Sequence, residues 1–288
     1  MVNVTAAAGH LGRRIVRELL KQGCAPEDLT LSVRDPAKAS EFAKEGCRVR
    51  QADYDDEESL TRAFSECNTV VLIPSFAMVE ARIHQHYKAL RAAKIAGVER
   101  IVHLGFQATS LETPFILAPY LLYAESKLRQ SGLGWTILRN GLYADPLVDY
   151  APKLVQTGRI PYPAGEGRIS YISRDDLARS AAAASLDRSH TGKLYELTGP
   201  EALSIADLAS ILSRITGKEI RYDPASETEF LEMCREPGVP DYVPQALFSI
   251  YQGAARGDFD RTTNHVELLT GSPAEPLESY LKRNVALN

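Results

Sequence analysis

The sequence has few of the residues that mark several protein classes. Among its 288 residues there is one tryptophan, and there are three methionines and four cysteines. Cys24, Cys47, Cys67 and Cys234 are scattered and match no metal-ligand or redox spacing, so we expect reduced thiols and no metal site. The longest apolar runs, such as residues 69–73, fall far short of the ~20 residues of a membrane span, and no basic leader precedes the first apolar segment. These shortages predict a cytoplasmic protein without a membrane partner.

The sequence also lacks a strong excess of charge of either sign. It has 33 Lys and Arg against 37 Asp and Glu, for a net charge of −4. Without a basic excess to neutralise phosphates, nucleic acid is not an expected partner. Hydrophobic residues make up 44% and charged residues 24%, which is ordinary for a soluble globular protein and excludes a disordered or fibrous chain.

Short apolar segments alternate with amphipathic ones through the first half. Their aliphatic and β-branched content predicts strands that are buried on both faces. The expected strands are residues 2–4, 29–33, 47–50, 69–73, 100–104 and 135–139, and the expected helices are residues 11–22, 57–66, 78–96 and about 116–131. Strict alternation implies right-handed crossovers and a parallel sheet with helices on both faces.

The pattern changes after about residue 145. Proline and glycine punctuate residues 146–168, and helices are then expected at 174–186 and 204–216, with a short strand at 220–222. We therefore predict an α/β fold in which a doubly wound parallel Rossmann sheet forms an NAD(P)-binding domain at residues 1–145. A smaller mixed α/β C-terminal substrate lobe follows at residues 146–288.

A phosphate-binding turn is expected between the first strand and the first helix. Residues 5–12 read Thr-Ala-Ala-Ala-Gly-His-Leu-Gly, so Gly9 and Gly12 occupy two positions of the three-glycine dinucleotide pattern and Ala6 the third. If that turn requires a positive φ at Ala6, alanine costs roughly 1 kcal/mol there. A tight turn without a ligand would show the same two glycines.

The end of the second strand predicts which dinucleotide binds. NAD sites usually carry an acidic residue there, whereas NADP needs a cation for its 2′-phosphate. This chain has Arg34 followed by Asp35, with Lys38 one helical turn further, which favours NADP(H) over NAD(H). An ion pair between Arg34 and Asp35 on the surface is the alternative. The full set of predicted cofactor-binding residues is Thr5, Ala6, Ala8, Gly9, His10, Leu11, Gly12, Arg34, Lys38, Asp53, Tyr54, Ile73 and Pro74.

These segments together resemble a known family. Residues 5–12, Val33-Arg34-Asp35, Ala52-Asp53-Tyr54, Leu138-Arg139-Asn140-Gly141, Tyr195-Glu-Leu-Thr198 and Leu268-Leu-Thr-Gly-Ser-Pro273 are similar to the NmrA-like atypical short-chain dehydrogenases. The resemblance spans nearly the whole chain. It is strongest to triphenylmethane-dye reductases and NADPH-dependent quinone reductases, and it extends in the C-terminal half to fungal alkaloid dehydrogenases. It implies an NADPH-binding lobe and a small lobe that closes a substrate cleft, and the family also includes redox sensors that bind NADP without turnover.

A Tyr-x-x-x-Lys motif is also present, at Tyr123 and Lys127, with Ser110 thirteen residues before the tyrosine. In principle the lysine lowers the phenol pKa so that the tyrosine can donate a proton to a carbonyl. Counting back from Arg139 by the spacing of the related enzymes instead places Leu121 at the position of the active lysine. Lys127 would then lie ~9 Å further along the helix. We therefore expect Glu125 and Lys127 to be solvated, and the catalytic residue stays unknown.

Four residues at the ends of strands 4 to 6 are predicted to contact substrate. They are Phe76, Phe106, Asn140 and Tyr143, of which the aromatic ones could wall a flat aromatic molecule. Core packing would explain each aromatic residue almost as well, and Asn140 could instead cap a turn. His84 and His86 face different sides of a helix, and His103 lies within a strand, so none of them is an expected metal ligand.

Three functions follow from these observations. The first is an NADPH-dependent oxidoreductase that transfers hydride to a small aromatic electrophile such as a quinone, a triphenylmethane dye or an iminium ion. The second is a catalytically silent NADP(H)-binding sensor that acts through a protein partner, which Ala6 and Leu121 favour. The third is an interaction protein that has lost the nucleotide. The sequence leaves the assembly open between a monomer and a homodimer.

Overall fold

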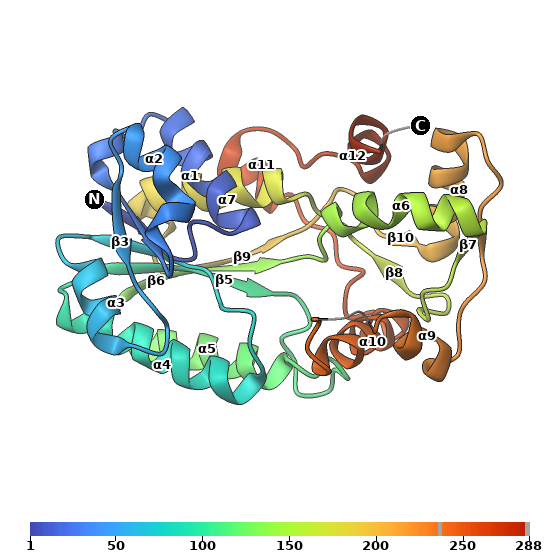
Figure 1. Ribbon diagram of the computed structural model, residues 1–288, viewed down its shortest axis with the longest axis horizontal. Helices are drawn as coiled ribbons and strands as arrows, with labels where there is room; N and C mark the ends of the chain where they lie inside the picture. Colours follow the sequence, from blue (N-terminus) through green and yellow to red (C-terminus); the bar gives the residue numbers. More distant parts are fainter. Residues whose placement is uncertain (236–237, 286–288) are drawn as a thin grey trace.

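A seven-stranded parallel sheet lies at the centre of the structure, a computed structural model that describes residues 1–235 and 238–285 (Figure 1). The strand order is β3-β2-β1-β4-β5-β6-β9. The strands are β1 Val2–Val4, β2 Leu29–Val33, β3 Arg48–Gln51, β4 Thr69–Leu72, β5 Arg100–Phe106, β6 Gly134–Asn140 and β9 Lys193–Leu197. The direction of strand addition reverses between β1 and β4, and open sheets of this type bind ligands at the carboxyl ends of the strands beside such a point.

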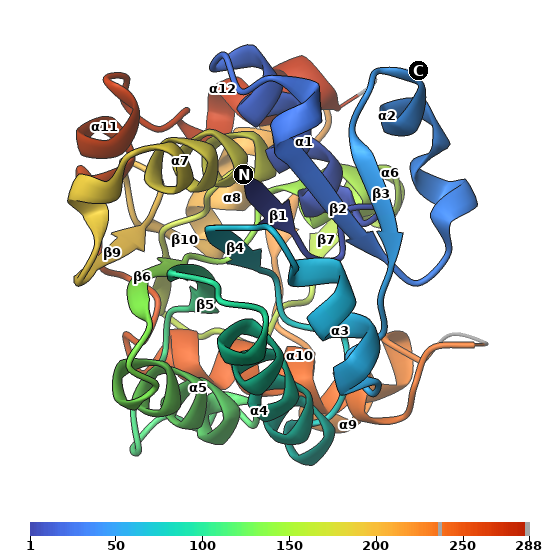
Figure 2. The ribbon, with the colours of Figure 1, turned by 90° about the vertical axis from the view of Figure 1, so that its left-hand side faces the viewer.

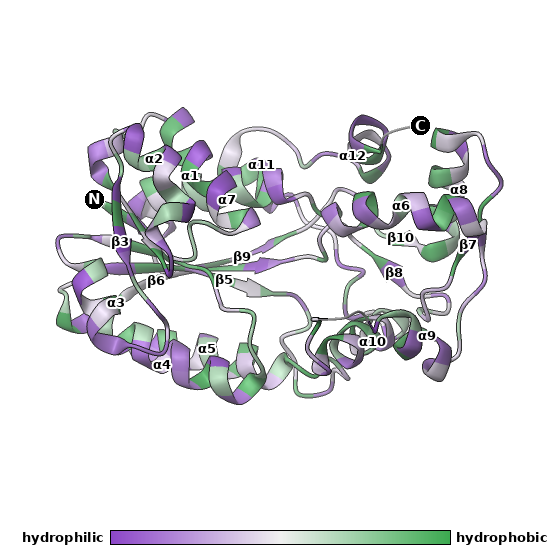
Figure 3. Cartoon of the chain, viewed as in Figure 1, coloured by the Kyte–Doolittle hydropathy of each residue, from purple (hydrophilic) through white to green (hydrophobic). Residues whose placement is uncertain are grey.

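The burial of the strands explains why they form. Every residue of β1, β2 and β4 is buried, because helices cover both faces of the sheet. The edge strand β3 is exposed or half-buried along its length, and Figure 3 shows it as predominantly hydrophilic. The predicted doubly wound sheet is confirmed, with strand bounds within about two residues of those expected.

Two groups of helices cover the sheet (Figure 2). On one face α1 packs beside α7 and α7 beside α11, and on the other α4 packs between α3 and α5. The helices of this layer are α1 His10–Lys21, α2 Ser40–Lys44, α3 Glu57–Phe64, α4 Val79–Ile95, α5 Ala118–Gln130, α7 Arg174–Leu186 and α11 His265–Thr270. The apolar stripe of α1 buries Leu11, Ile15 and Leu19 against the sheet, while Leu20 is only partly buried.

The remaining elements form a smaller mixed lobe beyond the carboxyl ends of the sheet strands (Figure 1). Its helices are α6 Asp145–Thr157, α8 Ile205–Thr216, α9 Glu227–Met233, α10 Tyr242–Ala255 and α12 Leu277–Asn284. Two small sheets join them, one pairing β8 Arg168–Ile169 with β10 Leu203–Ser204 and one pairing β7 Arg159–Ile160 with β11 Arg221–Tyr222. Among the described residues no helix is both long and apolar enough to span a bilayer.

The chain returns to the large sheet after its first entry into the small lobe. Strand β9 pairs with β6 and α7 packs on α1, although both follow residue 145. A division of the chain at that residue therefore leaves one strand and two helices of the sheet layer on the C-terminal side. The alternation of the first half carries no signal for this return, because β9 follows an excursion through α6 and the two short strands β7 and β8.

Candidate functional site

The turn between β1 and α1 has the geometry of a close-packed phosphate loop. Ala6 has a φ of +48°, and its carbonyl accepts a hydrogen bond of 2.9 Å from the Gly9 N–H. A Cβ atom on Gly12 would lie 2.3 Å from that same carbonyl oxygen, so the position admits only glycine. The turn therefore does hold Ala6 in the left-handed region, where a non-glycine residue is strained.

The first turn of α1 leaves its backbone donors available to an anion. Gly9 occupies the N-cap position without a side chain to cap it, and the first turn contains no acidic residue. Gly9 and His10 are exposed at this end, whereas Leu11 is buried. Unpaired N–H groups and the positive end of the helix dipole favour phosphate here.

Three of the predicted cofactor residues, Thr5, Tyr54 and Ile73, are hydrogen-bonded to one another. The buried Thr5 hydroxyl donates to the Val71 carbonyl at 3.1 Å and accepts the Ile73 N–H at 2.9 Å. The Tyr54 hydroxyl lies 2.7 Å from the Thr5 hydroxyl and also donates to the Ile73 carbonyl, and burial raises the pKa of this phenol. These contacts join the carboxyl ends of β1, β3 and β4 beneath the turn, with Pro74 following at once in the chain.

The end of β2 presents two exposed cations. Arg34 and Lys38 have no carboxylate partner among the described residues. Asp35 accepts a hydrogen bond from the Ala37 N–H and begins a 3₁₀ turn, so the surface ion pair considered above is not formed. Arg13 of α1 bridges this segment to the phosphate turn. It donates through Nε to the Ala8 carbonyl at 3.0 Å and through Nη2 to the Lys38 carbonyl.

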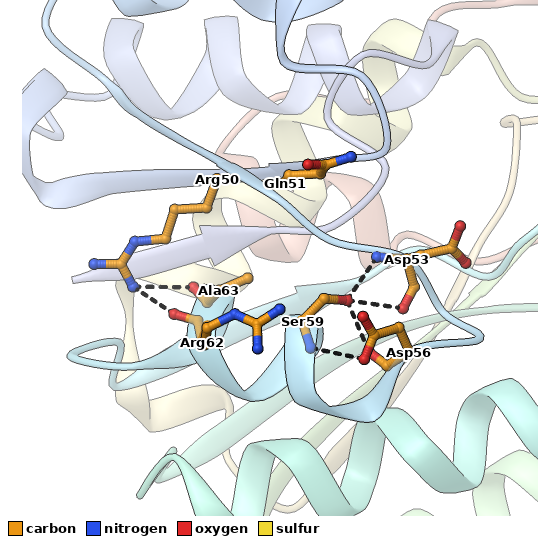
Figure 4. A pocket seen from close by; sticks show the side chains of 7 residues that line it. All are labelled: Arg50, Gln51, Asp53, Asp56, Ser59, Arg62 and Ala63. Carbon is orange, nitrogen blue, oxygen red and sulfur yellow. Dashed lines mark hydrogen bonds between the residues drawn. The ribbon is translucent and has the colours of Figure 1, made fainter.

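Asp53 borders an open hollow between β3 and α3 (Figure 4). Its carboxylate accepts the Asp55 N–H at 2.9 Å. At the far end of the hollow, Arg50 donates to carbonyls at the C-terminal end of α3, including that of Arg62 at 2.9 Å. Asp53 is the single predicted cofactor residue that lines this hollow.

Three of the four predicted substrate residues lie together. The Phe106 ring lies 6.4 Å from the Tyr143 ring, and the Asn140 Nδ2 donates to the Tyr143 hydroxyl at 3.2 Å. The Asn140 Oδ1 is buried without a hydrogen-bond partner among the described residues. Phe76 is 73% exposed and contacts Tyr242 of α10 instead, with ring centroids 6.0 Å apart. Loop β4–α4 therefore meets the small lobe through Phe76.

The structure does not pair Tyr123 with Lys127 through its hydroxyl. The Lys127 Nζ lies 5.8 Å from the centroid of the Tyr123 ring, and burial raises the Tyr123 pKa, the opposite of what a catalytic phenol needs. Leu121 is buried in an apolar cluster in the first turns of α5. The expectation that Glu125 is solvated is wrong, because Glu125 is buried and accepts two hydrogen bonds from Arg139, at 2.7 and 2.9 Å.

The histidines beneath this region lie in the core. The rings of His86 and His103 meet edge to face at 5.1 Å. Burial lowers the pKa of His103 to about 4 and that of His86 well below its usual value, so both are neutral at pH 7. No cluster of three or more His, Cys, Asp or Glu side chains in the described part of the chain has the arrangement of a metal site.

Comparison with known proteins identifies the family. A family model described as NAD(P)H-binding matches residues 6–188. Quinone oxidoreductase 2 of Escherichia coli is 34% identical over 277 residues, which cover 96% of both chains. The chain belongs to the NmrA-like family of NAD(P)H-dependent reductases.

Other members of this NmrA-like family agree over the full length. An NAD(P)H azoreductase of Xenophilus azovorans is 27% identical and covers 99% of this chain and 98% of its own. The crystal structure of Citrobacter sp. triphenylmethane reductase complexed with NADP(H) superposes with a TM-score of 0.92 at 30% identity, covering 99% of this chain and 100% of the other.

The residues of this NmrA-like chain fit a nicotinamide dinucleotide. The uncapped N-terminus of α1 offers donors for the pyrophosphate, and the exposed Gly9 adds no side chain at this end, while Gly12 lets α1 pack against the Ala6 backbone. Sequence reasoning missed Arg13, because an amphipathic pattern shows only that it faces away from the core. It also missed Tyr120, a buried ring in the first turn of α5, which lies one position from Leu121.

Proposed function

We propose that this protein is an NADPH-dependent reductase of small aromatic electrophiles, with NADPH preferred over NADH. The observation that carries the proposal is the exposed Arg34 directly after β2, without an ion-pair partner among the described residues. An unpaired guanidinium at this position meets a 2′-phosphate through two hydrogen bonds. A neutral ribose 2′-hydroxyl, as in NADH, would not need a cation at this position.

The cofactor supplies a hydride when it is bound, and the protein residues orient the acceptor. Phe106 and Tyr143 provide aromatic surfaces, and the buried, unpartnered Asn140 Oδ1 provides a hydrogen-bond acceptor. The first turns of α5 hold Leu121, which has no proton to donate. This arrangement supports acceptors that are electrophilic enough to react without a protein acid at that position, such as quinones, triphenylmethane cations or iminium ions.

Titration of the purified protein with NADPH and NADH tests this proposal. Nicotinamide fluorescence reports binding, and addition of a quinone or a cationic dye then reports turnover. We expect NADPH to bind at least tenfold more tightly than NADH, and its fluorescence to decay when an acceptor is added. Equal affinity for the two dinucleotides would refute the assignment of Arg34.

The strained Ala6 and the apolar Leu121 favour a second candidate, an NADP(H) sensor without turnover. In that case NADPH would bind tightly, yet neither quinone, dye nor iminium acceptor would oxidise it. The same titration therefore separates the two functions, because only the reductase consumes the bound NADPH.

A further inference from the structure

Another cation without a carboxylate partner among the described residues, Arg82, lies in the first turns of α4. Arg82 is partly buried, and its Nε donates to the Ala77 carbonyl. Neither of its Nη nitrogens has a hydrogen-bond partner among the described residues, and no described carboxylate lies within ion-pair distance. Arg174, which lies over the Tyr143 ring at 5.3 Å, is by contrast paired with Asp145 at 3.5 Å. Arg82 therefore keeps hydrogen-bonding capacity that none of the described residues uses.

The guanidinium of Arg82 lies over one phenol ring and within electrostatic range of two other tyrosines. Its carbon lies 5.7 Å from the centroid of the Tyr120 ring, and its charge acts on the hydroxyls of Tyr143 and Tyr242. These tyrosines come from α5, from the loop after β6 and from α10. Arg82 thus lies where the sheet layer, the predicted substrate residue Tyr143 and the small lobe meet.

This position is unfavourable for a cation unless a ligand uses it. Burial lowers the pKa of Arg82, and the N-terminal end of a helix dipole repels positive charge. Glu80 is the acidic residue of the same helical turn, but it is exposed and two positions away, so it faces another side of the helix. Within the described part of the chain, the Arg82 charge at the carboxyl edge of the sheet therefore has the Tyr120 ring beside it but no carboxylate.

We propose that Arg82 binds the oxygen of the acceptor on which negative charge develops. The favoured substrates are then quinones and related electrophiles whose reduction places negative charge on an oxygen, and cationic dyes and iminium ions are disfavoured. This inference rests on the proposed reductase function and selects among the acceptors named there. Arg82 therefore determines specificity. It donates hydrogen bonds to a neutral acceptor, whereas its positive charge repels a cationic one.

The chemistry is balanced without a protein acid. The quinone takes up a hydride from the reduced nicotinamide, and the electron pair displaced from a carbonyl π bond becomes the lone pair of a phenolate oxygen. The two Nη groups donate hydrogen bonds to that oxygen as its charge grows, which stabilises the transition state. Water then supplies one proton, giving the hydroquinone, while the nicotinamide is left oxidised.

Arg82→Gln tests the inference, with menadione as the neutral quinone and crystal violet as the cationic acceptor. We expect kcat/KM for menadione to fall by about 10- to 100-fold, and kcat/KM for crystal violet to stay unchanged or to rise. The affinity for NADPH should not change. Arg82→Lys, which keeps the charge but loses the planar pair of donors, should recover part of the menadione activity.

Arg91→Gln is the matched control, because Arg91 lies on the same helix with its guanidinium 5.8 Å from the Tyr87 ring. It should leave both activities unchanged. Equal losses with both acceptors in Arg82→Gln would overturn the inference and assign Arg82 a structural role, as would unchanged menadione activity. If Arg82→Gln does not fold, unchanged menadione activity in Arg82→Lys would overturn it instead. If neither menadione nor crystal violet led the wild-type protein to oxidise NADPH, the reductase proposal itself would fail. That result would be obtained without any Arg82 variant.

Discussion

Ala6→Gly should stabilise the protein, because it removes strain from the turn before α1. A left-handed conformation costs an alanine about 1–2 kcal/mol, and the φ of Ala6 is +48°. Glycine adopts this conformation freely, but its more flexible unfolded chain offsets about 0.4–1 kcal/mol of the gain. We expect a net increase of about 0.5–1 kcal/mol in the free energy of unfolding. With an entropy of unfolding of about 2.1 cal/mol/K for each of 288 residues, the Tm should rise by about 1–2 °C.

Differential scanning calorimetry and urea denaturation of the dinucleotide-free protein can measure this change. Ala8→Gly is the control, since Ala8 lies in the same turn but does not have a positive φ. The control should lower the free energy of unfolding by about 0.5–1 kcal/mol. If Ala6→Gly destabilised the protein as much as Ala8→Gly did, the turn would not strain Ala6 and the reasoning would be refuted.

Three further results are expected. Arg34→Glu should weaken NADPH binding by about 10- to 100-fold and NADH binding much less, as measured by fluorescence titration; a uniform loss would indicate damage to the fold. Tyr123→Phe should keep kcat/KM within about twofold in steady-state assays, since Lys127 lies against the ring face, whereas a hundredfold loss would restore the Tyr-x-x-x-Lys pair as catalytic. Burial lowers the pKa of His103 to about 4, whereas its pKa in the unfolded chain is near 6.5. Between these two values the unfolded chain binds more protons than the folded protein, so the free energy of unfolding falls as the pH falls. From pH 7 to 5 this side chain should cost about 2 kcal/mol, and urea denaturation of His103→Leu should show a correspondingly flatter pH dependence.

Local patterns in the sequence were sufficient for most of the sheet and for the turn before α1. Buried parallel strands are continuous apolar runs, and amphipathic helices separate them, so both show in short windows. The position of Leu121 came instead from the spacing of the related enzymes, counted back from Arg139, and the structure places that residue among apolar side chains.

Features that depend on distant segments could not be predicted in this way. Glu125 looked solvated because its partner Arg139 comes from a neighbouring strand. No signal in the sequence marked Arg13 or Arg82, since a helical pattern does not show which carbonyls or phenols a side chain contacts. Their environments appear only when the loops after β2 and β4 and helix α10 are brought together.

The return of β9 to the sheet has a consequence for synthesis of the chain. While a ribosome has released only the first half, β6 is an open edge, and Arg139 lacks Glu196 of β9, its ion-pair partner at 3.4 Å. An unpaired parallel edge invites pairing with another chain. The nascent protein must therefore keep that edge protected until the C-terminal half emerges, and a fragment ending near residue 145 would be a poor mimic of a free-standing dinucleotide domain.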